Sequence, residues 1–287
     1  MIPYNSPHGL AAFLAQRGLS LKKRFGQNFL VNAGVRDRIL ALLAPEKGMC
    51  VWEVGPGLGC MTALILEAGC TLRAFEIDRG FIAVLKEEFA DGKGSFTLAE
   101  GDVLDAWPAF KDDSPAAVFG NLPYSAAAAL IADFLEKDFT ASRWVFMVQK
   151  EVALRMTAKP GTKDYSSFSI LCQSFMDVRL CFDVPSSAFY PRPEVLSAVV
   201  ELRPRPEAPR IACRGLYLGL VRAVFASRRK TLKNNLIPWA RSLKQDDAWA
   251  GDLLDAAGLP AGIRGETLCV EELVRLANAA AELVRRP

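Results

Sequence analysis

Histidine is nearly absent from this sequence: His8 is the only one among 287 residues. It lies in a leader rich in Pro, Asn, Ser and Gly, which we expect to be mobile. Serine and cysteine hydrolases that depend on a histidine base are therefore excluded. The seven cysteines are odd in number and contain no CxxC pair, which argues against a disulfide framework and against a zinc site. We expect reduced cysteines in the core and no bound metal.

Long apolar runs are also missing. The longest stretches, such as residues 126–132, are far shorter than the roughly 20 residues that cross a membrane. The N-terminus has no apolar signal segment with a cleavage site. With 51% hydrophobic and 23% charged residues, the chain is typical of a soluble globular protein with one large and one small domain. We therefore expect a cytoplasmic protein that does not enter a membrane.

Charge is unevenly distributed, although the net charge is only +3. Residues 1–30 carry four basic and no acidic side chains, and residues 203–287 carry 15 basic and nine acidic ones. Residues 31–202, in contrast, carry 16 basic and 23 acidic side chains. Basic flanks around an acidic middle indicate a polyanionic partner held by the two ends of the chain. Ordinary solvated helix faces are the alternative explanation.

Short apolar runs rich in β-branched and aromatic residues alternate with segments of helical periodicity. This alternation predicts repeated strand–helix units and hence a largely parallel, doubly wound α/β sheet. The predicted strands are 49–55, 71–77, 95–101, 116–121 and 143–149. Two further strands, 177–184 and 196–203, form a closing pair joined by a Pro-rich connection.

A Pro-rich linker at residues 203–209 is followed only by segments with helical patterns. We therefore place a domain boundary at this linker. The predicted organisation is a basic N-terminal segment, an α/β domain and a small all-helical C-terminal domain. These parts comprise residues 1–30, 31–203 and 204–287.

The sequence EVGPGLG, residues 53–59, follows the first predicted strand. Its glycines let the backbone turn sharply and approach a ligand closely, while the next helix presents its N-terminus. A dinucleotide-binding fingerprint needs a further glycine where this chain has Cys60, so the spacing here is GxGxG. That spacing is common in methyltransferases that use S-adenosylmethionine, and it favours methyl transfer as the activity.

Carboxylates follow the next two predicted strands. Glu76 comes 21 residues after Gly55, where a carboxylate can accept hydrogen bonds from both ribose hydroxyls of an adenosine. Ile77 can pack on the adenine, and Asp102 can accept from the exocyclic amine of that adenine. Either carboxylate alone is explained as well by a helix N-cap or a solvated loop charge. Ligands of doubly wound sheets bind at the carboxyl ends of strands, however, and all these residues lie there.

The sequence GNLPYS, residues 120–125, ends the fourth predicted strand. The exocyclic amine of adenine is a poor nucleophile, because its lone pair is delocalised into the ring. Asn121 Oδ1 and a backbone carbonyl of the turn can accept the two amine hydrogens and favour the tetrahedral geometry that attack on a methyl group requires. Tyr124 can hold the base flat by stacking. Locally, Ser125 also fits a helix N-cap.

The chain resembles a known family over nearly its whole length. It is similar to the ribosomal RNA adenine dimethyltransferases, and most closely to the bacterial small-subunit enzymes, in KKRFGQNFL (22–30), EVGPGLG, NLPY, FYPRPEVLSAV (189–199) and FASRRKTLKNNL (225–236). The resemblance implies that Tyr124 stacks on the target adenine and that Phe189 is a second aromatic of the base pocket. The implied S-adenosylmethionine residues are Asn28, Leu30, Gly55, Glu76, Asp102 and Asn121.

The resemblance also implies the substrate. It indicates dimethylation of two adjacent adenines in small-subunit ribosomal RNA, late in assembly, by a monomer that acts on a pre-assembled subunit. Two residues depart from the family pattern: Glu194 stands where a lysine is usual, and Ser227 replaces a polar or basic residue. Neither belongs to the cofactor set, so these departures bear on RNA contact and leave the chemistry unchanged.

The basic ends of the chain are the expected RNA contacts. In residues 221–236 basic side chains recur at helical spacing, which predicts one helix with a cationic face. Val221, Phe225 and Leu232 would pack inward from the same helix. The predicted RNA-binding residues are Lys22, Lys23, Arg24, Arg222, Arg228, Arg229, Lys230 and Lys233.

Three alternatives remain open. An RNA-associated factor that has kept the fold without catalysis is disfavoured by the intact Glu76, Asp102 and Asn121. A nicotinamide-dependent oxidoreductase is disfavoured by Cys60 and by the lack of a recognisable hydride-handling set. The erythromycin-resistance methyltransferases, which act on large-subunit RNA, are the closest rival, and only the basic tail SRRKTLKNNL favours the small-subunit pattern.

Overall fold

The protein is described by a computed structural model that covers residues 2–22, 26–89, 95–124 and 126–285. The chain folds into two units. The first comprises Met1–Ala153 and Arg179–Pro204, and the second comprises Leu154–Val178 and Arg205–Pro287. The second unit resumes inside the predicted linker. It also contains residues 154–178, which the sequence-based boundary assigns to the α/β domain.

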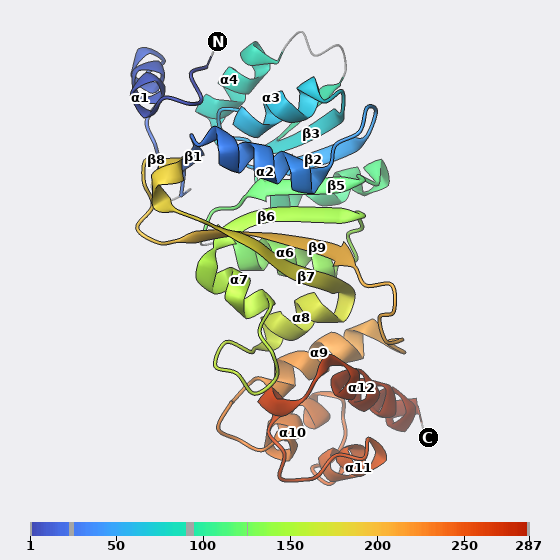
Figure 1. The fold of residues 1–287 in the computed structure, drawn as a ribbon. Coiled ribbons are helices and arrows are strands. Elements are labelled where there is room, and N and C mark those ends of the chain that lie inside the picture. The colour runs from blue at the N-terminus through green and yellow to red at the C-terminus, as the bar shows by residue number, and fades with distance from the viewer. Residues whose placement is uncertain (1, 23–25, 90–94, 125, 286–287) are drawn as a thin grey trace. The chain divides into compact units, whose positions relative to one another are not determined.

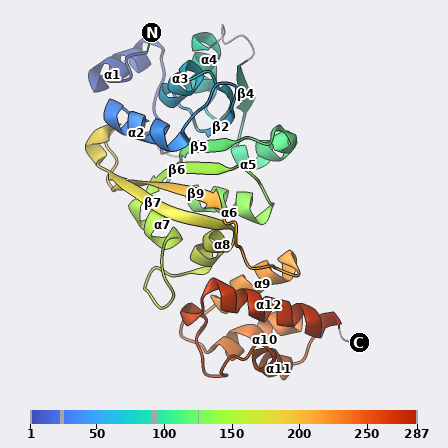
Figure 2. The same ribbon diagram turned by 45° about the vertical axis from the view of Figure 1, so that its right-hand side comes forward.

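The first unit is built on a seven-stranded sheet (Figures 1 and 2). The strands are β2 (Cys50–Val54), β3 (Thr71–Glu76), β4 (Phe96–Glu100), β5 (Ala117–Asn121), β6 (Arg143–Gln149), β7 (Met176–Val184) and β9 (Ser197–Pro204). Their order is β4-β3-β2-β5-β6-β9-β7, in which the first five are parallel and β9 is antiparallel to β6. The predicted doubly wound sheet is confirmed, with every predicted strand end within one residue.

Both faces of this sheet are packed, which explains why its strands are apolar throughout. Along β2, Val51 belongs to an apolar cluster that includes Ile39 and Ile65, whereas the next residue, Trp52, stacks on Phe139 with ring centroids 5.0 Å apart. The helices of this unit include α2 (Ala33–Leu43), α3 (Cys60–Glu67), α4 (Arg79–Glu88), α5 (Val103–Ala106), α6 (Ala127–Glu136) and α7 (Lys150–Met156), with 3-10 helices η2 (Trp107–Asp113) and η3 (Ser186–Ala188).

The N-terminal leader is helical, so the expectation of a mobile segment around His8 is wrong. Helix α1 (Pro7–Gln16) begins with a proline at its first position, and Ser6 Oγ caps it by accepting from Gly9 N at 3.0 Å. Leu10 and Leu14 are buried in a cluster with residues of α4. The capping serine and the proline are the sequence signals that identify this helix.

A small second sheet joins two of the motifs that carry the family resemblance, residues 22–30 and residues 189–199. Strand β1 (Phe29–Leu30) pairs antiparallel with β8 (Phe189–Tyr190), although about 160 residues of chain separate them (Figure 1). Leu30 lies opposite Phe189, and Phe29 lies opposite Tyr190. This pairing brings the end of KKRFGQNFL beside the start of FYPRP. Two-residue strands carry no periodicity, so the sequence pattern does not predict them.

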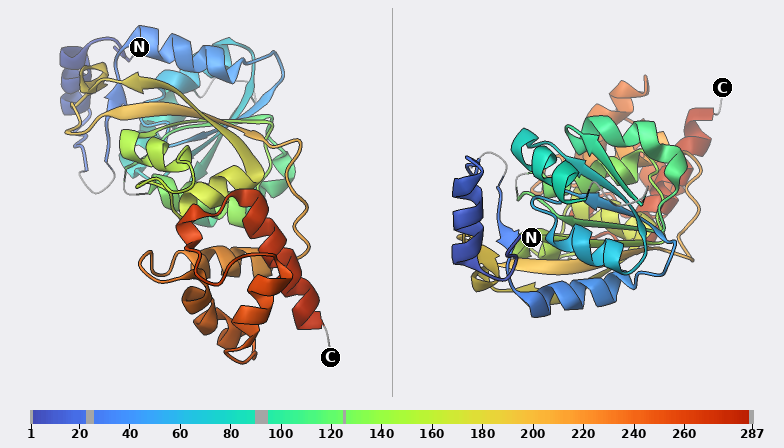
Figure 3. Two further views of the ribbon diagram at one scale, coloured as in Figure 1. Left: turned by 60° about the horizontal axis from the view of Figure 1, so that its bottom comes forward. Right: turned by 90° about the horizontal axis from the view of Figure 1, so that it is seen from above.

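The second unit is helical, as the sequence predicts for residues after the linker (Figure 3). Its helices include α8 (Ser167–Phe175), α9 (Arg214–Val224), α10 (Leu232–Ser242), α11 (Trp249–Ala256) and α12 (Val270–Arg285), with the 3-10 helix η4 (Gly265–Thr267). One apolar cluster contains buried residues of α8 to α12. Tyr165 Oη donates to Leu268 O at 2.7 Å inside the unit, which ties residues 154–178 to the C-terminal helices.

The prediction of one continuous helix over residues 221–236 is wrong. Helix α9 ends at Val224, and α10 begins at Leu232. Asn235 of α10 bonds to residues before it in the chain: its Nδ2 donates to the main-chain oxygens of Val224 (3.0 Å) and Ser227 (2.9 Å). Thr231 then caps α10. Buried polar contacts thus replace helical hydrogen bonds, and the basic residues do not share one helical face.

No helix within the described residues is long and apolar enough to cross a membrane. Across the same parts of the chain, no three His, Cys, Asp or Glu side chains gather in a way that could hold a metal ion. The seven cysteines are free; two of them are buried and five are half-buried.

Candidate active site

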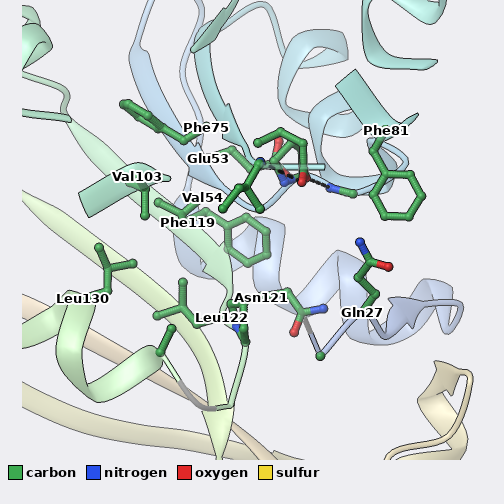
Figure 4. Close-up of a pocket in the computed structure, with 18 of the residues that line it drawn as sticks. Gln27, Glu53, Val54, Phe75, Phe81, Val103, Phe119, Asn121, Leu122 and Leu130 are labelled. Carbon is green, nitrogen blue, oxygen red and sulfur yellow. Dashed lines mark hydrogen bonds between the residues drawn. The ribbon is translucent and has the colours of Figure 1, made fainter. Parts of the chain in front are cut away.

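A cavity of about 300 Å³ lies at the carboxyl ends of β2, β3 and β5. Figure 4 shows Asn121, Leu122 and Gln27 on one side of it and Glu53, Phe75 and Phe81 on the other. Such a volume suits a small molecule of nucleoside size. All six predicted cofactor residues line this cavity: Asn28, Leu30, Gly55, Glu76, Asp102 and Asn121.

The glycine loop connects β2 to α3 beside the cavity. Gly55 and Gly57 have φ angles of 68° and 58°, a region that disfavours residues with a Cβ. A Cβ at Gly57 would lie 3.3 Å from Phe29 Cε1, and one at Gly59 would lie 2.6 Å from Phe89 Cε2. Glycine is therefore required for the loop to approach its neighbours this closely.

Glu76 ends β3 and is only 5% exposed. Its Oε1 accepts from the N–H groups of Ile77 (3.0 Å) and Asp78 (2.8 Å), and its Oε2 accepts from Gly57 N at 3.1 Å. Burial raises the pKa of Glu76, and these three N–H groups oppose that shift. A carboxylate offers about four acceptor positions, so Oε2 retains capacity for a hydroxyl donor in the cavity.

Glu53, at the neighbouring strand end, is a cavity residue that the sequence reasoning missed. It is 1% exposed, and its Oε2 accepts from Thr62 Oγ1 at 2.6 Å. Burial raises the pKa of Glu53 to about 7, Thr62 opposes the shift, and the charge of Glu76 adds to it. Glu53 opens the EVGPGLG motif at a strand end, and that position was the available signal.

Asp102 is both a helix cap and a cavity residue. Its Oδ1 accepts from Leu104 N at 3.0 Å and caps α5, while the residue itself is exposed and lines the cavity. The N-cap explanation considered from the sequence is therefore correct locally, and the second carboxylate oxygen is still an acceptor. Ile77 lines the same cavity with 41% of its surface exposed. An apolar side chain is thus presented beside two carboxylates.

Asn121 is oriented by a contact from the N-terminal segment. Its Nδ2 donates to the main-chain oxygen of Asn28 at 2.9 Å, so the amide oxygen is directed elsewhere. In the following turn, Pro123 O accepts two N–H groups at the start of α6, whereas no main-chain donor within the described residues bonds to Leu122 O. Asn121 Oδ1 and Leu122 O are therefore two acceptors next to one another along the chain at the cavity.

The two aromatic residues of the predicted base pocket have different surroundings. Tyr124 is half-buried, and its Oη lies 2.8 Å from Ser197 Oγ, which restrains the ring. Phe189 is 3% exposed and packs with Leu30 in an apolar cluster. Neither ring lines the cavity, although Pro123 beside Tyr124 does. Phe189 lies beside the cavity residue Leu30, and its role as a second aromatic of the base pocket stays a prediction.

The basic residues of the N-terminal segment are only partly described. Lys23 and Arg24 lie outside the described residues. Lys22 Nζ pairs with Asp78 Oδ2 at 2.9 Å, and the main-chain N–H of Lys22 donates to Gln27 Oε1 at 2.8 Å. Gln27 Nε2 in turn donates to Asp78 Oδ2 at 3.1 Å. Lys22 and Gln27 are therefore both bonded to Asp78, the N-cap of α4.

The basic residues of the second unit are exposed to different degrees. Arg222, on α9, is exposed, as are Arg229 and Lys230 in the turn before α10. Lys233 is half-buried, and its Nζ would lie 3.3 Å from a Cβ on Gly251 of α11. Arg228 is exposed as well, and its guanidinium is bonded to other segments of the same unit.

A doubly wound sheet with a GxGxG loop and a nucleoside-sized cavity at its strand ends is the arrangement of a methyltransferase. More particularly, the sequence model of the family described as "Ribosomal RNA adenine dimethylase" matches residues 18–246. The chain belongs to that family.

Bacterial relatives are similar over nearly the full length. A protein of Treponema denticola named "Ribosomal RNA small subunit methyltransferase A" is 41% identical over 283 residues, which cover 98% of this chain and 96% of the relative. A protein of the same name from Halothermothrix orenii is 36% identical over 280 residues, covering 95% of this chain and 92% of the relative.

Solved structures share the fold. A dimethyladenosine transferase from Plasmodium falciparum superposes with a TM-score of 0.72 at 24% identity, covering 85% of this chain and 94% of that one. The 23S rRNA methyltransferase ErmE superposes with a TM-score of 0.61 at 22% identity, covering 87% of this chain and 98% of that one. At these identities the likeness concerns the fold.

Proposed function

We propose that this protein transfers methyl groups from S-adenosylmethionine to the exocyclic amines of adenines in small-subunit ribosomal RNA. The observation that carries the proposal is the hydrogen bond from Asn121 Nδ2 to Asn28 O, which fixes an amide oxygen at a nucleoside-sized cavity. Membership of the adenine dimethylase family supports the reaction, and the names of the bacterial relatives support the RNA substrate.

The cavity fits the adenosine part of the cofactor. Glu76 can accept a ribose hydroxyl at Oε2, Asp102 can accept from the adenine amine, and the exposed Ile77 can pack on the ring. When bound, S-adenosylmethionine supplies an electrophilic methyl group. The rest of the proposed pocket is formed by Asn28, Leu30 and Gly55.

Two acceptors of this chain orient the target amine for methyl transfer. Asn121 Oδ1 and Leu122 O accept its two hydrogens, which draws the nitrogen lone pair out of the ring and towards the methyl group. Tyr124 stacks on the base, with its ring restrained by Ser197. Phe189, which packs beside Leu30, is the second aromatic of the proposed base pocket. None of these steps requires a histidine base.

Replacing Glu76 by alanine should weaken S-adenosylmethionine binding by about 10- to 100-fold, since a charge-assisted hydrogen bond contributes roughly 1.5–3 kcal/mol. Isothermal titration measures the dissociation constant directly. Asp105→Ala is the matched control, because Asp105 is exposed on α5 and does not line the cavity. A dissociation constant unchanged by the Glu76 substitution would exclude the ribose role.

The two ends of the chain have separate proposed roles. Residues 1–30 contribute Asn28 and Leu30 to the cofactor site, and residues 31–203 form the catalytic domain. Residues 204–287 bind RNA through exposed basic side chains such as Arg222 and Arg229. Lys22, Lys23 and Arg24 are the other proposed RNA contacts.

Substituting Arg229, Lys230 and Lys233 together by alanine should weaken binding to small-subunit RNA and flatten its salt dependence. For each phosphate that is no longer neutralised, the slope of log K against log salt should fall by roughly 0.7–0.9. Cofactor affinity and folding should stay as in the wild type, because none of these residues lines the cavity. If affinity and salt slope match the wild type, the N-terminal basic segment becomes the better candidate.

Mass spectrometry of ribosomal RNA from cells with and without the protein tests the proposed function. We expect dimethylated adenines at two adjacent positions of the small-subunit RNA only when the protein is present, and more modification of pre-assembled subunits than of naked RNA. Modification of large-subunit RNA would instead favour the erythromycin-resistance activity. We further propose that the protein acts as a monomer in the cytoplasm.

A further inference from the structure

Arg228 connects segments of the second unit that are distant in the sequence. It lies in the turn between α9 and α10, and its Nη1 and Nη2 donate to the main-chain oxygens of Lys163 (2.6 Å) and Thr162 (3.1 Å). Its Nε pairs with Glu266 Oε2 at 2.5 Å. All three nitrogen atoms of the guanidinium thus have partners inside the protein, an arrangement that the forked shape of arginine permits.

The loop of residues 159–164 is held by its backbone while its residues are exposed. On one side, Tyr165 is fully buried and donates to Leu268 O at 2.7 Å. Within the loop, Gly161 N donates to Glu266 O at 2.8 Å. Together with the bonds from Arg228, these contacts join the loop to two other segments, the turn before α10 and residues 266–268, and so fix its course.

The contacts made by Arg228 bring together basic side chains from the loop and from the turn. Within the described part of the chain, none of these side chains forms an ion pair, whereas Glu266 is already paired with Arg228. Asp164 is the single acidic residue of the loop. The local charge is therefore positive. The basic side chains are Lys159, Lys163, Arg229 and Lys230.

We propose that residues 159–164 are a second phosphate-contacting element for RNA, with Lys159 and Lys163 as its contacts and Arg228 as the residue that positions it. This inference rests on the proposed RNA substrate. Positive charge without internal partners, on a loop of fixed course, is complementary to a phosphate backbone. Arg228 acts mainly through the loop, since each of its three guanidinium nitrogens donates to a group inside the protein.

The test compares two double variants that remove the same charge from the second unit. Lys159→Ala/Lys163→Ala alters the loop, and Arg210→Ala/Arg285→Ala removes two exposed cations elsewhere in the same unit. Binding to small-subunit RNA from cells that lack the protein is measured over a series of KCl concentrations at constant Mg²⁺. We expect the loop variant to bind about tenfold more weakly, and the slope of its log K against log salt to fall in magnitude by roughly 1.4–1.8. The control should stay close to the wild type in both quantities.

Arg228 variants separate positioning from direct contact. Arg228→Lys keeps the charge but has a single nitrogen in place of the planar fork, so it cannot reproduce the geometry of the three bonds, and we expect it to lose nearly as much RNA affinity as Arg228→Ala. Hydrogen exchange of the backbone amides of residues 159–164 should rise in both variants. In the Lys159→Ala/Lys163→Ala background, Arg228→Ala should add little, because the two changes act on one element.

Two results would overturn the inference. One is an RNA affinity and salt slope of the loop variant equal to those of the Arg210→Ala/Arg285→Ala control. The other is wild-type RNA affinity in Arg228→Lys, which would make Arg228 a direct charge contact. Failure of the proposed function is distinguishable, because the wild-type protein itself would then neither methylate nor bind the RNA, and the role of the loop would fall with it.

Discussion

Asn121→Ala is expected to lower the rate of methyl transfer by about 100- to 1,000-fold, the usual effect of removing one group that stabilises a transition state. The missing acceptor acts on the amine as it becomes tetrahedral, so turnover should fall more than the affinity for RNA. Cofactor affinity should fall less as well, although Asn121 lines the cavity. Single-turnover rates at saturating RNA and cofactor measure the chemical step, and titrations measure the two affinities.

Asn121→Asp tests how the acceptor is held. Aspartate keeps an oxygen at the same position but cannot donate to Asn28 O as Asn121 Nδ2 does at 2.9 Å. If that bond orients the acceptor, the aspartate variant should also lose most of its turnover. A variant Asn121→Ala that binds poorly yet turns over normally when saturated would contradict the proposed role.

Local periodicity accounts for the success of the fold prediction. In β2, Val51 and Trp52 face opposite packed surfaces, which makes a continuous apolar run, and the flanking glycines mark where the run ends. Features made by distant contacts were not predictable in this way. The β1–β8 pairing is one such feature, and the bond from Tyr165 to Leu268 that ties residues 154–178 to the second unit is another.

The candidate site followed from one topological rule. Carboxyl ends of parallel strands meet at one edge, so Gly55, Glu76 and Asn121 could be grouped before any contact was known. The rule says nothing of side chains that act on other side chains or on distant backbone. Arg228 was assigned to RNA because of its charge, whereas its position is set by carbonyl groups about 65 residues away in the chain.

Glu53 should make the first unit less stable as the pH rises. Burial raises the pKa of this carboxyl from an ordinary value of 4.5 to about 7 in the folded protein. Between these values the folded state binds more protons than the unfolded state, so the free energy of unfolding falls with increasing pH. The stabilising contribution is complete below pH 4.5 and is lost as the pH rises through about 7. A shift of this size corresponds to about 3 kcal/mol.

The groups around Glu53 determine how this effect can be isolated. Glu76 adds negative charge from β3, Cys60 and Thr62 face Glu53 from α3, and Arg36 and Tyr4 belong to the same electrostatic neighbourhood. Burial raises the pKa of Glu76 too, so its titration adds to the pH dependence of the wild type with the same sign.

Glu53→Gln keeps an acceptor for Thr62 and removes the titrating group, so it should match the wild type near pH 4.5 and be more stable by up to about 3 kcal/mol at pH 8. Pulsed hydrogen exchange of peptides from β2 and β3 in a denaturant series, without cofactor, measures opening of the first unit. Glu151→Gln, at an exposed position of α7, should show the same pH dependence as the wild type. A stability difference between Glu53→Gln and the wild type that stays constant from pH 5 to pH 8 would mean that Glu53 is ionised throughout, which would contradict the raised pKa.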